Sequence, residues 1–459
     1  MIIQSRDNET IIAQCTPKGP GAIALIRMSG AGALELASSI SRLPGNARLI
    51  DQQSHTIAYG WVTGHDGADI DQVLFLVMHG PRTFTGEHTV EITCHNNPFI
   101  IDQIIDRAIA CGARHAQEGE FSRRAVMNGK MDLTQAEGIN ELIGAQTQHA
   151  LKRSLAQVTG SLSQQITQLE KELIKALALC EASFEFIDEE MEFAPEINRI
   201  VSLQRDHIAR MKEAFSNNRQ IKEGVRVALV GSVNAGKSSL FNALLNRERS
   251  IVTNIAGTTR DSIEAGLYAN GAFITLVDTA GLRQTDDVVE QAGIERSCNE
   301  AELADILIII IDGSRAITPA EEAVYKELLE KHSHKAFLVR TKSDLPACPV
   351  PLLDALPHYP VSTSDHLAIT GLNKAISERI DTIFSTSDSP FLLNKRQFHL
   401  LSALDTDLAA LQTRLEGKVE YELVSYHLND AIARLAEITG KTISEASMDA
   451  VFREFCVGK

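Results

Sequence analysis

The residues from Gly231 to Ser238 could hold the phosphates of a nucleotide. They read Gly-Ser-Val-Asn-Ala-Gly-Lys-Ser, which is the G-x-x-x-x-G-K-S pattern of a P-loop. In such a loop, backbone N–H groups surround phosphate oxygens, and the helix that follows adds the positive end of its dipole. Lys237 adds a positive charge, and the hydroxyl of Ser238 suits Mg²⁺. We therefore predict a binding site for a nucleotide with Mg²⁺.

Three further motifs follow the P-loop in the order that a GTPase needs. The stretch 257–260 reads Gly-Thr-Thr-Arg, and a loop threonine there can bind Mg²⁺ only while a γ-phosphate is present, which makes a switch. The stretch 278–281 reads Asp-Thr-Ala-Gly, whose aspartate acts on Mg²⁺ indirectly and whose glycine lets the backbone approach the γ-phosphate. The stretch 341–344 reads Thr-Lys-Ser-Asp, whose carboxylate can accept the N1–H and N2–H₂ donors of guanine. This order predicts GTP as the nucleotide.

Three positions depart from the usual GTPase pattern. Thr341 stands where asparagine is usual, which puts a polar stabilising contact in doubt but leaves the base reading by Asp344. Ser362 is the predicted last base contact, although alanine is usual in that motif. Leu282 follows the Asp-Thr-Ala-Gly motif, where many GTPases have a glutamine that orients water. Catalysis must then come from elsewhere, and we consider a monovalent cation near the P-loop and the acidic residue Glu290. On spacing alone, Glu290 is better explained as a solvated surface charge.

The region around these motifs alternates strands and helices. This alternation over residues 221–382 predicts a parallel sheet that helices cover on both faces. The expected strands are Val225–Val230, Ala272–Val277, Asp305–Ile311 and Lys335–Val339.

Helical segments flank this region on both sides. In residues 121–220, apolar side chains recur at spacings of three and four, as in a helix bundle. They are Leu162, Ile166, Leu169, Leu173 and Leu177. Similar spacing after residue 390 predicts the second part of the same bundle, so the sheet domain is inserted into it.

The first 120 residues are predicted to form a separate α+β domain. The expected strands are Gly21–Arg27, His55–Val62, Gln72–Met78 and Thr89–Cys94, with helices at Ala33–Ile40 and Phe99–Ala110. The predicted fold class is thus multidomain α/β and α+β. The predicted domains are 1–120 (N-terminal), 121–220 (first helical part), 221–382 (G domain) and 383–459 (second helical part).

Composition limits the classes of partner and compartment. The 459 residues carry a formal net charge of −16, which argues against a protein that coats nucleic acid, so RNA contact needs a local basic patch. That patch, or alternatively a solvated helix face, could consist of Arg123, Arg124, Lys130, Lys152 and Arg153. The seven cysteines contain no C-x-x-C pair, which favours reduced thiols in a cytoplasmic protein. No apolar run approaches the ~18 residues of a membrane span, and no signal peptide is visible.

Motifs along the whole chain resemble one family, the bacterial and organellar tRNA modification GTPases of the MnmE/TrmE type. The matching stretches are Gly19–Gly30, Gly80–Glu87, Gly119–Glu137, Ile251–Asp261, Asp278–Arg283, Gly293–Ser297 and the tail Phe455–Lys459. Within the P-loop, Ser232-Val233 replaces the family's common x-Pro, and His95-Asn-Asn97 replaces its His-Gly-Gly.

The resemblance implies a function that the motifs alone do not give. Proteins of this family act with an FAD-dependent partner of the MnmG/GidA type in a heterotetramer or larger complex. Together they add an aminomethyl-type group, such as carboxymethylaminomethyl, to C5 of the wobble uridine of certain tRNAs. A tetrahydrofolate derivative supplies one carbon, and glycine or ammonium supplies the nitrogen. The N-terminal domain resembles folate-binding domains and forms a homodimer, and K⁺ stimulates GTP hydrolysis through pairing of the G domains.

The resemblance also assigns nucleotide and ion contacts. It implies K⁺ ligands at Asn234, Thr253, Ile255 and Thr258, Mg²⁺ ligands at Ser238 and Thr259, and a water-positioning role for Glu290. The full set of predicted GTP contacts is Asn234, Ala235, Gly236, Lys237, Ser238, Ser239, Thr253, Asn254, Ile255, Ala256, Gly257, Thr258, Thr259, Asp278, Thr279, Ala280, Gly281, Thr341, Lys342, Ser343, Asp344 and Ser362.

Folate contacts and a tail cysteine are implied in the same way. The residues that match the family's folate contacts are Arg27, Glu91, Lys130 and Lys459. A glutamate can receive the N–H donors of the pterin, while arginine and lysine suit the carboxylates of the glutamate tail. Cys456 matches a tail cysteine of the family, and an inert buried thiol is the alternative.

A second class of function stays open at this point. The chain could be a P-loop GTPase of ribosome assembly or signalling that acts as a binding module, with its flanks as interaction domains. The flanks discriminate between the two hypotheses, because folate contacts and a Cys-x-Gly-Lys tail have no role in the second.

Overall fold

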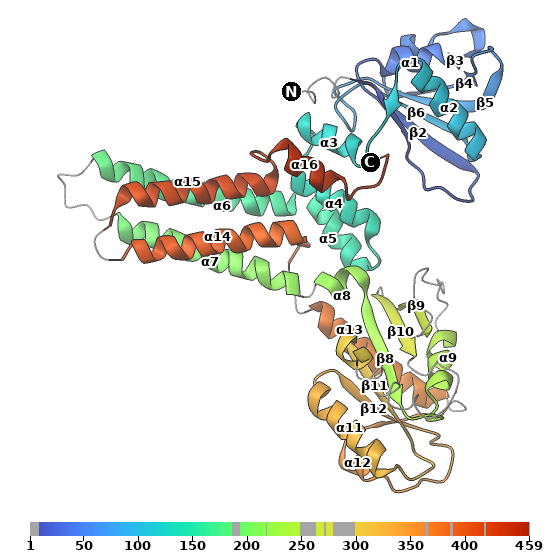
Figure 1. Ribbon diagram of the computed structural model, residues 1–459, viewed down its shortest axis with the longest axis vertical. Coiled ribbons are helices and arrows are strands. Elements are labelled where there is room, and N and C mark those ends of the chain that lie inside the picture. Colours follow the sequence, from blue (N-terminus) through green and yellow to red (C-terminus); the bar gives the residue numbers. More distant parts are fainter. Residues whose placement is uncertain are drawn as a thin grey trace. The chain divides into compact units, whose positions relative to one another are not determined.

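The computed structural model describes residues 9–185, 193–216, 218–247, 263–269, 272–278, 299–362, 366–385, 389–416 and 419–458 (Figure 1). They belong to two compact units. The first unit comprises Met1–Asn140, Gln157–Arg205 and Ala403–Lys459, and the second comprises Glu141–Ala156 and Asp206–Ser402. The second unit therefore interrupts the first along the chain, which agrees with the predicted insertion. The predicted domain borders stay predictions.

A seven-stranded sheet forms the N-terminal part of the first unit, in the order β3-β4-β5-β6-β2-β1-β7. Its strands are β1 (Ile11–Gln14), β2 (Ile23–Ser29), β3 (Ser41–Arg42), β4 (Thr56–Thr63), β5 (Asp69–Met78), β6 (Thr89–His95) and β7 (Arg114–His115). Neighbouring strands are antiparallel except β1 and β7. The sequence correctly predicts β2, β4, β5 and β6, but β1, β3 and β7 are too short to give a periodic signal.

Apolar side chains alternate along these strands and bury one face of the sheet. Ile26, Phe75 and Ile92 pack there against Ile104 of the helix α2 (Pro98–Ala110), and α1 (Ala33–Ser39) covers the same core. The short 3₁₀ helices η1 (Pro44–Asn46) and η2 (Leu49–Asp51) follow α1. The two main helices agree with the predicted ones.

The opposite face of this sheet carries apolar side chains that are exposed. Ile57 of β4 lies opposite Leu76 of β5, and Tyr59 lies opposite Leu74, so the four side chains share one face. Ile57 is 65% exposed and Leu74 is 41% exposed. This open face has a role in the proposed function.

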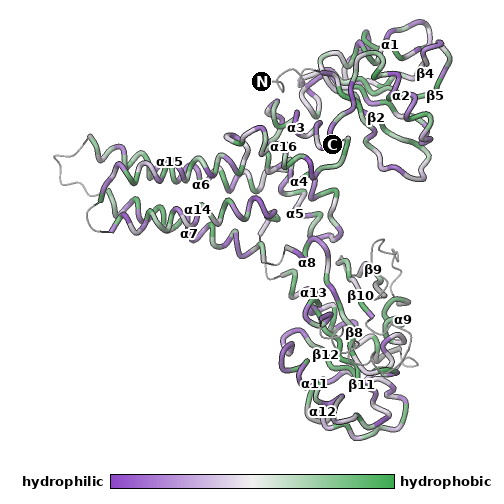
Figure 2. The backbone as a smooth tube through the Cα atoms, in the orientation of Figure 1, coloured by the Kyte–Doolittle hydropathy of each residue, from purple (hydrophilic) through white to green (hydrophobic). Residues whose placement is uncertain are grey.

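The rest of the first unit is helical. Its helices are α3 (Glu120–Met127), α4 (Leu133–Gly144), α6 (Ser161–Glu185), α7 (Ala194–Ser216), α14 (Lys395–Arg414), α15 (Tyr421–Thr439) and α16 (Glu445–Phe452). The helices α4, α7 and α14 continue into the second unit, and α5 (Gln148–Val158) lies mostly in that unit. Figure 2 shows polar and apolar residues alternating along the long helices α6, α7, α14 and α15. Within the described part of the chain, no helix has both the length and the low polarity that crossing a bilayer requires.

The predicted apolar stripe of α6 is right over four positions and wrong at the fifth. Leu162, Ile166, Leu169 and Leu173 are buried, but Leu177 is only partly buried. The buried stripe continues through Ala176 and Cys180 instead. These positions keep the alternating spacing of four and three that holds one face of a helix in line, and Leu177 lies one position outside it.

The second unit contains a six-stranded sheet in the order β13-β12-β11-β8-β10-β9. Its strands are β8 (Val225–Gly231), β9 (Ile263–Ala269), β10 (Ala272–Asp278), β11 (Ile306–Asp312), β12 (Ala336–Thr341) and β13 (Tyr359–Pro360). All neighbours are parallel except β9 and β10. The predicted mostly parallel sheet is confirmed, with β9 and β13 as strands that the sequence reading missed.

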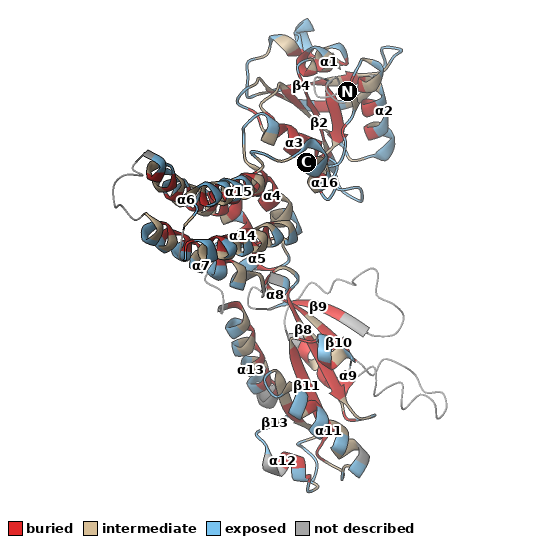
Figure 3. Ribbon diagram, turned by 60° about the vertical axis from the view of Figure 1, so that its left-hand side comes forward, coloured by how far each residue is buried: buried red, intermediate tan, exposed pale blue. Residues whose placement is uncertain are grey.

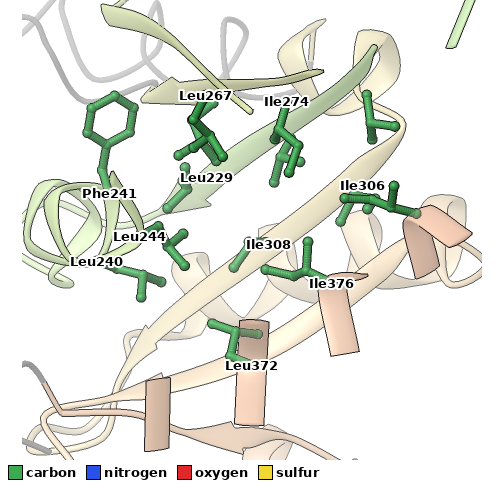
Figure 4. Close-up of a cluster of buried hydrophobic side chains, with 14 of the residues drawn as sticks. Leu229, Leu240, Phe241, Leu244, Leu267, Ile274, Ile306, Ile308, Leu372 and Ile376 are labelled. Carbon is green, nitrogen blue, oxygen red and sulfur yellow. The ribbon is translucent and has the colours of Figure 1, made fainter. Parts of the chain in front are cut away.

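Helices cover both faces of this sheet. They are α8 (Asn218–Glu223), α9 (Lys237–Arg247), α11 (Pro319–His332), α12 (Pro351–Ala355) and α13 (His366–Ser385). Side chains of the buried strand β11 alternate between the two cores. Ile308 packs with Leu240 and Leu372 (Figure 4), while Ile309 packs on the opposite face with Tyr325. Figure 3 shows the central strands as buried. This sheet holds the P-loop at the carboxyl end of its strand β8.

Candidate functional site

The P-loop connects β8 to α9, as the motif requires. A Cβ atom on Gly231 would lie 2.4 Å from the carbonyl oxygen of Ile310 on the neighbouring strand, so only glycine fits there. Asn234 and Gly236 have φ angles of +59° and +93°, and these left-handed residues curve the loop before α9 begins at Lys237. The backbone thus forms the turn that a phosphate-binding loop needs.

Lys237 lies inside the curve of this loop. Its side chain is 6% exposed, and its Nζ donates hydrogen bonds of 2.6 Å to the carbonyl oxygens of Gly231 and Ser232. Burial lowers the pKa of Lys237, although the nearby charge of Asp278 opposes this shift. The ammonium group is therefore fixed inside the loop that the sequence predicts to bind phosphate.

Ser238, in the first turn of α9, meets Asp278, at the carboxyl end of β10. The Ser238 hydroxyl donates a 2.9 Å hydrogen bond to Oδ2 of Asp278, which is 1% exposed at the end of β10. A hydroxyl and a carboxylate offer the hard oxygen atoms that Mg²⁺ prefers, so these two residues fit the ion. Among the described residues, no cluster of three or more His, Cys, Asp or Glu side chains forms a metal site.

The predicted base-reading loop contacts the P-loop through Thr341. The Thr341 hydroxyl donates to the carbonyl oxygen of Ala235 at 2.6 Å and to that of Ile311 at 3.2 Å. Thr341 and Ala235 are both buried. The polar contact that the sequence left in doubt at this position is therefore present.

The next two residues of this loop, Lys342 and Ser343, also contact neighbouring segments. Lys342 has a φ of +55°, and its Nζ lies 2.5 Å from Oδ2 of Asp312. Burial acts to raise the pKa of Asp312, but hydrogen bonds from Lys342 and Ser314 outweigh it, so the pKa is lowered. The amide of Ser343 donates to the carbonyl of Val361 at 3.3 Å.

Asp344 and Ser362 therefore belong to segments that lie side by side. Asp344 is exposed, and Ser362, directly after Val361, is buried. An exposed carboxylate at this place is accessible to a guanine base.

Several predicted site residues lie outside the described residues, and their roles stay predictions. They are Thr253, Asn254, Ile255, Ala256, Gly257, Thr258, Thr259, Thr279, Ala280, Gly281, Glu290 and Lys459.

In the first unit, the predicted folate contacts Arg27 and Glu91 form an ion pair. They lie opposite each other on β2 and β6, and a guanidinium nitrogen of Arg27 is 2.8 Å from Oε1 of Glu91. The guanidinium also lies 5.5 Å from the ring centroids of both Phe84 and Phe121. The pair is only partly exposed, at 16% and 15% for the two side chains.

Lys130 reaches the same loop that passes the arginine. Its Nζ donates a 2.8 Å hydrogen bond to the carbonyl of Pro81, and Phe84 of that loop lies against Arg27. A cavity of about 270 Å³ lies along the loop, lined by Ala31, Gly80, Gly86, Glu87 and His88. Two of the four predicted folate residues, Lys130 and Arg27, therefore contact this loop, and Glu91 joins them through its ion pair with Arg27.

The C-terminal tail is fixed against the first unit. The amide of Gly119 donates to the carbonyl of Cys456 at 3.3 Å, and the Cys15 thiol donates to the carbonyl of Gly458 at 3.2 Å. A bridge also joins Glu118 and Val457. Cys456 is exposed, so its thiol is not buried, and its reactivity stays a prediction.

The proposed basic patch is wrong for two of its arginines. Arg124 is 3% exposed and pairs with Glu87 and Glu120 at 3.1 Å, while Arg123 pairs with Asp449 at 2.9 Å. Glu87 and Asp449 come from distant parts of the sequence, whereas Glu120 lies four positions before Arg124 on the same helix. Together they neutralise charges that the sequence suggests are free for RNA.

Sequence reasoning also missed two residues beside the P-loop, Arg315 and Tyr325, which both contact Ser232. They lie 83 and 93 positions after Ser232, and no motif marks them.

Two family models match the chain. One, described as "MnmE helical domain", matches residues 133–456, and the other, "GTP-binding protein TrmE N-terminus", matches residues 10–130.

Among solved structures, Aquifex aeolicus Era bound to GDP·AlF₄⁻ is 25% identical with a TM-score of 0.26, over 40% of this chain and 66% of that one. The G domain of the T. maritima FeoB iron transporter is 25% identical with a TM-score of 0.23, over 35% and 98%. Because both TM-scores are this low, we draw no conclusion about function from these structures.

Three curated relatives are similar to this chain over nearly the full length of both proteins. The tRNA modification GTPase MnmE of Parasynechococcus marenigrum is 38% identical over 100% of both chains. MnmE of Protochlamydia amoebophila is 35% identical over 98% of each, and that of Parabacteroides distasonis is 36% identical over 98% of this chain and 100% of its own. The chain therefore belongs to the MnmE family of tRNA modification GTPases.

Proposed function

We propose that this chain is the GTP-hydrolysing component of a complex that adds an aminomethyl-type group to C5 of the wobble uridine of certain tRNAs. The observation that carries the proposal is the joined nucleotide site. The Thr341 hydroxyl ties the base-reading loop to the P-loop, and Ser238 meets Asp278, in a chain whose full-length relatives are named tRNA modification GTPases.

In the G domain, the described residues of the nucleotide site each have a part in binding GTP. Lys237 and the backbone amides of the P-loop neutralise the phosphates, Ser238 holds Mg²⁺ and Asp278 supports it. Mg²⁺, when bound, neutralises the charge that develops on the phosphate oxygens. Asp344 reads the guanine edge.

Hydrolysis of the bound GTP needs further residues, which hold K⁺ and orient the attacking water. In the proposal, Asn234 with Thr253, Ile255 and Thr258 holds K⁺, and Glu290 orients the attacking water. Thr259 completes the Mg²⁺ site only in the GTP state. Leu282 supports this division of roles, because an apolar side chain cannot orient water in place of the usual glutamine.

In the first unit, Arg27, Glu91, Lys130 and Lys459 bind a tetrahydrofolate derivative, which supplies a one-carbon unit when bound. Arg27 suits a carboxylate of that ligand, and Glu91 suits its N–H donors. Their close ion pair supports the proposal, since it orients both groups at one place.

The chain acts as a homodimer through its N-terminal domain. The open sheet face supports this, because Ile57 and Tyr59 beside Leu74 form an exposed apolar surface that a second copy would cover. An FAD-dependent partner completes the complex. It also provides much of the tRNA affinity, since the net charge is −16 and two arginines of the expected patch are buried in ion pairs.

The GTPase part of the proposal is tested by steady-state hydrolysis of GTP in K⁺ and in Na⁺ at equal ionic strength. We expect a faster rate in K⁺, and Glu290→Ala should abolish turnover while GDP still binds. Equal rates in the two salts would remove the K⁺ assignment, and normal turnover of the variant would remove Glu290 from the mechanism.

A further inference from the structure

Ser232, the second residue of the P-loop, is held through all of its polar groups. Its amide donates a 2.9 Å hydrogen bond to the hydroxyl of Tyr325. Its own hydroxyl accepts a 2.9 Å hydrogen bond from Nη2 of Arg315, and its carbonyl accepts the 2.6 Å bond from Nζ of Lys237. Ser232 therefore links the phosphate-binding lysine to two side chains outside the loop.

The tyrosine is a fixed partner for this amide. Tyr325 lies on α11, is 3% exposed, and donates its hydroxyl proton to the carbonyl of Ile310 on β11 at 3.4 Å. Its hydroxyl thus bridges the core strand β11 and the P-loop. Burial raises the pKa of Tyr325, because it disfavours the charged phenolate.

The arginine is fixed as well. Nη2 and Nη1 of Arg315 lie 2.6 Å and 3.1 Å from the two carboxylate oxygens of Glu321, which is the bidentate arrangement that orients a guanidinium. Glu321 also accepts a hydrogen bond from the amide of Thr318, while the Thr318 hydroxyl accepts one from the amide of Glu321, which is the capping box of α11. The start of α11 therefore holds Arg315 in place against Ser232.

We propose that Arg315 and Tyr325 are positioning residues for nucleotide binding, which hold the Ser232 peptide so that the P-loop and Lys237 are preorganised for phosphate. We call Arg315, Glu321 and Tyr325 around Ser232 the Ser232 clamp. The inference deepens the proposed GTPase function and rests on it.

The direction of the Ser232 amide explains why a clamp matters. Because this N–H group donates to Tyr325, phosphate binding is left to the later amides of the loop. The loop itself contains no proline to restrict its φ angles, so side chains outside it must supply the constraint. Order that exists before binding does not have to be created by the ligand, and this raises affinity.

The test is the dissociation constant for GDP with Mg²⁺, together with kcat and KM for GTP hydrolysis, on the full-length protein. Tyr325→Phe keeps the ring in the core and removes only the hydroxyl. One lost hydrogen bond corresponds to roughly 3- to 10-fold in affinity. We expect that loss for GDP and a similar rise in KM for GTP, with kcat nearly unchanged.

A double-mutant cycle tests the contact between Arg315 and Ser232. Because the Arg315 side chain is partly exposed, we expect these substitutions to leave the fold intact. Ser232→Ala and Arg315→Ala should each weaken GDP binding about 2- to 5-fold, and the double variant should be no weaker than the worse single variant. Additive losses would mean that the two side chains do not act through their mutual contact.

Matched controls separate the clamp from general effects. Tyr359→Phe removes another tyrosine hydroxyl of the same unit, and Lys326→Ala removes a cation that pairs with Glu322 on the outer face of α11. Both should bind GDP like the wild type. If the clamp variants also bind GDP like the wild type and only melt at lower temperature, their role is structural and the inference is overturned. If the wild-type protein itself binds no guanine nucleotide, the proposed function fails instead.

Discussion

The hydroxyl of Thr341 donates a 2.6 Å hydrogen bond to the carbonyl oxygen of Ala235, and this bond joins the predicted base-reading loop to the P-loop. Both residues are buried, so water cannot replace the bond if it is lost. The two halves of the nucleotide site are therefore mechanically connected before any nucleotide binds.

Thr341→Val should weaken this connection with little change in shape. Removing the hydroxyl leaves the Ala235 carbonyl without this donor, which we expect to lower the free energy of unfolding of the second unit by about 1–2 kcal/mol. GDP affinity should fall with it, and isothermal titration calorimetry measures that change. Thr341→Ser keeps the donor and serves as the control. If valine and serine variants bind GDP equally well, the contact does not support nucleotide binding.

Asp344→Asn should change the preferred base. The carboxylate accepts two donors from guanine, whereas an amide replaces one of these acceptors with an NH₂ donor and pairs better with the extra carbonyl of xanthine. We expect the variant to bind xanthosine diphosphate more tightly than GDP, as measured by competition for a fluorescent nucleotide. A variant that still prefers GDP would show that residues 341–344 are not the base-reading loop.

Glu91→Ala should weaken folate binding and leave GTP hydrolysis unchanged. The change removes the partner of Arg27 at 2.8 Å and the group proposed to receive the pterin donors. We expect binding of a tetrahydrofolate derivative to fall by at least 10-fold in equilibrium dialysis, since a charge-assisted hydrogen bond contributes about 1.5–3 kcal/mol. The GTPase rate should not change. Glu35→Ala, an exposed acid of the same unit, is the control, and equal folate binding by both variants would contradict the assignment.

Glu321 predicts a dependence of stability on pH. The hydrogen bond from Arg315 lowers the pKa of Glu321 from 4.5 to about 2, against the opposing effect of burial. A carboxyl whose pKa is lowered by folding stabilises the folded state above its unfolded pKa, and this contribution disappears as pH falls through the folded pKa. The contribution should therefore be complete above about pH 4.5 and fade toward pH 2.

The measurement is the urea midpoint of wild type and Glu321→Gln at steps from pH 6 to pH 2.5. The wild type should lose more stability over this window than the variant, so the two midpoints converge in acid. Midpoints that fall in parallel would show that the Arg315 pair does not set this pKa.

The nucleotide motifs could be predicted because each is a short run of residues on one strand and loop. Gly231 and Lys237 are six positions apart, and local backbone geometry fixes their relation. The strand β9 was missed because Glu264 and Gly266 break its apolar pattern, and pairing with β10 over its full length supplies what the local sequence lacks.

Contacts between distant segments could not be read from spacing. Tyr325 meets Ser232 from a helix on the far side of β11, and Arg124 finds Glu87 across 37 positions. These partners depend on how the layers pack, and a single sequence does not encode that in any local period. For the same reason, the basic residues 123 and 124 looked like a surface patch although tertiary packing buries them.

We propose above that this chain takes part in modifying the wobble uridine of tRNA. Mass spectrometry of nucleosides from bulk tRNA tests it directly, in cells that lack this protein and in cells where it is restored as wild type or as Lys237→Ala. We expect the C5-modified uridine to be lost without the protein, to return with the wild type and to stay absent with the variant. If the modified nucleoside persists in cells that lack the protein, the proposed function is contradicted.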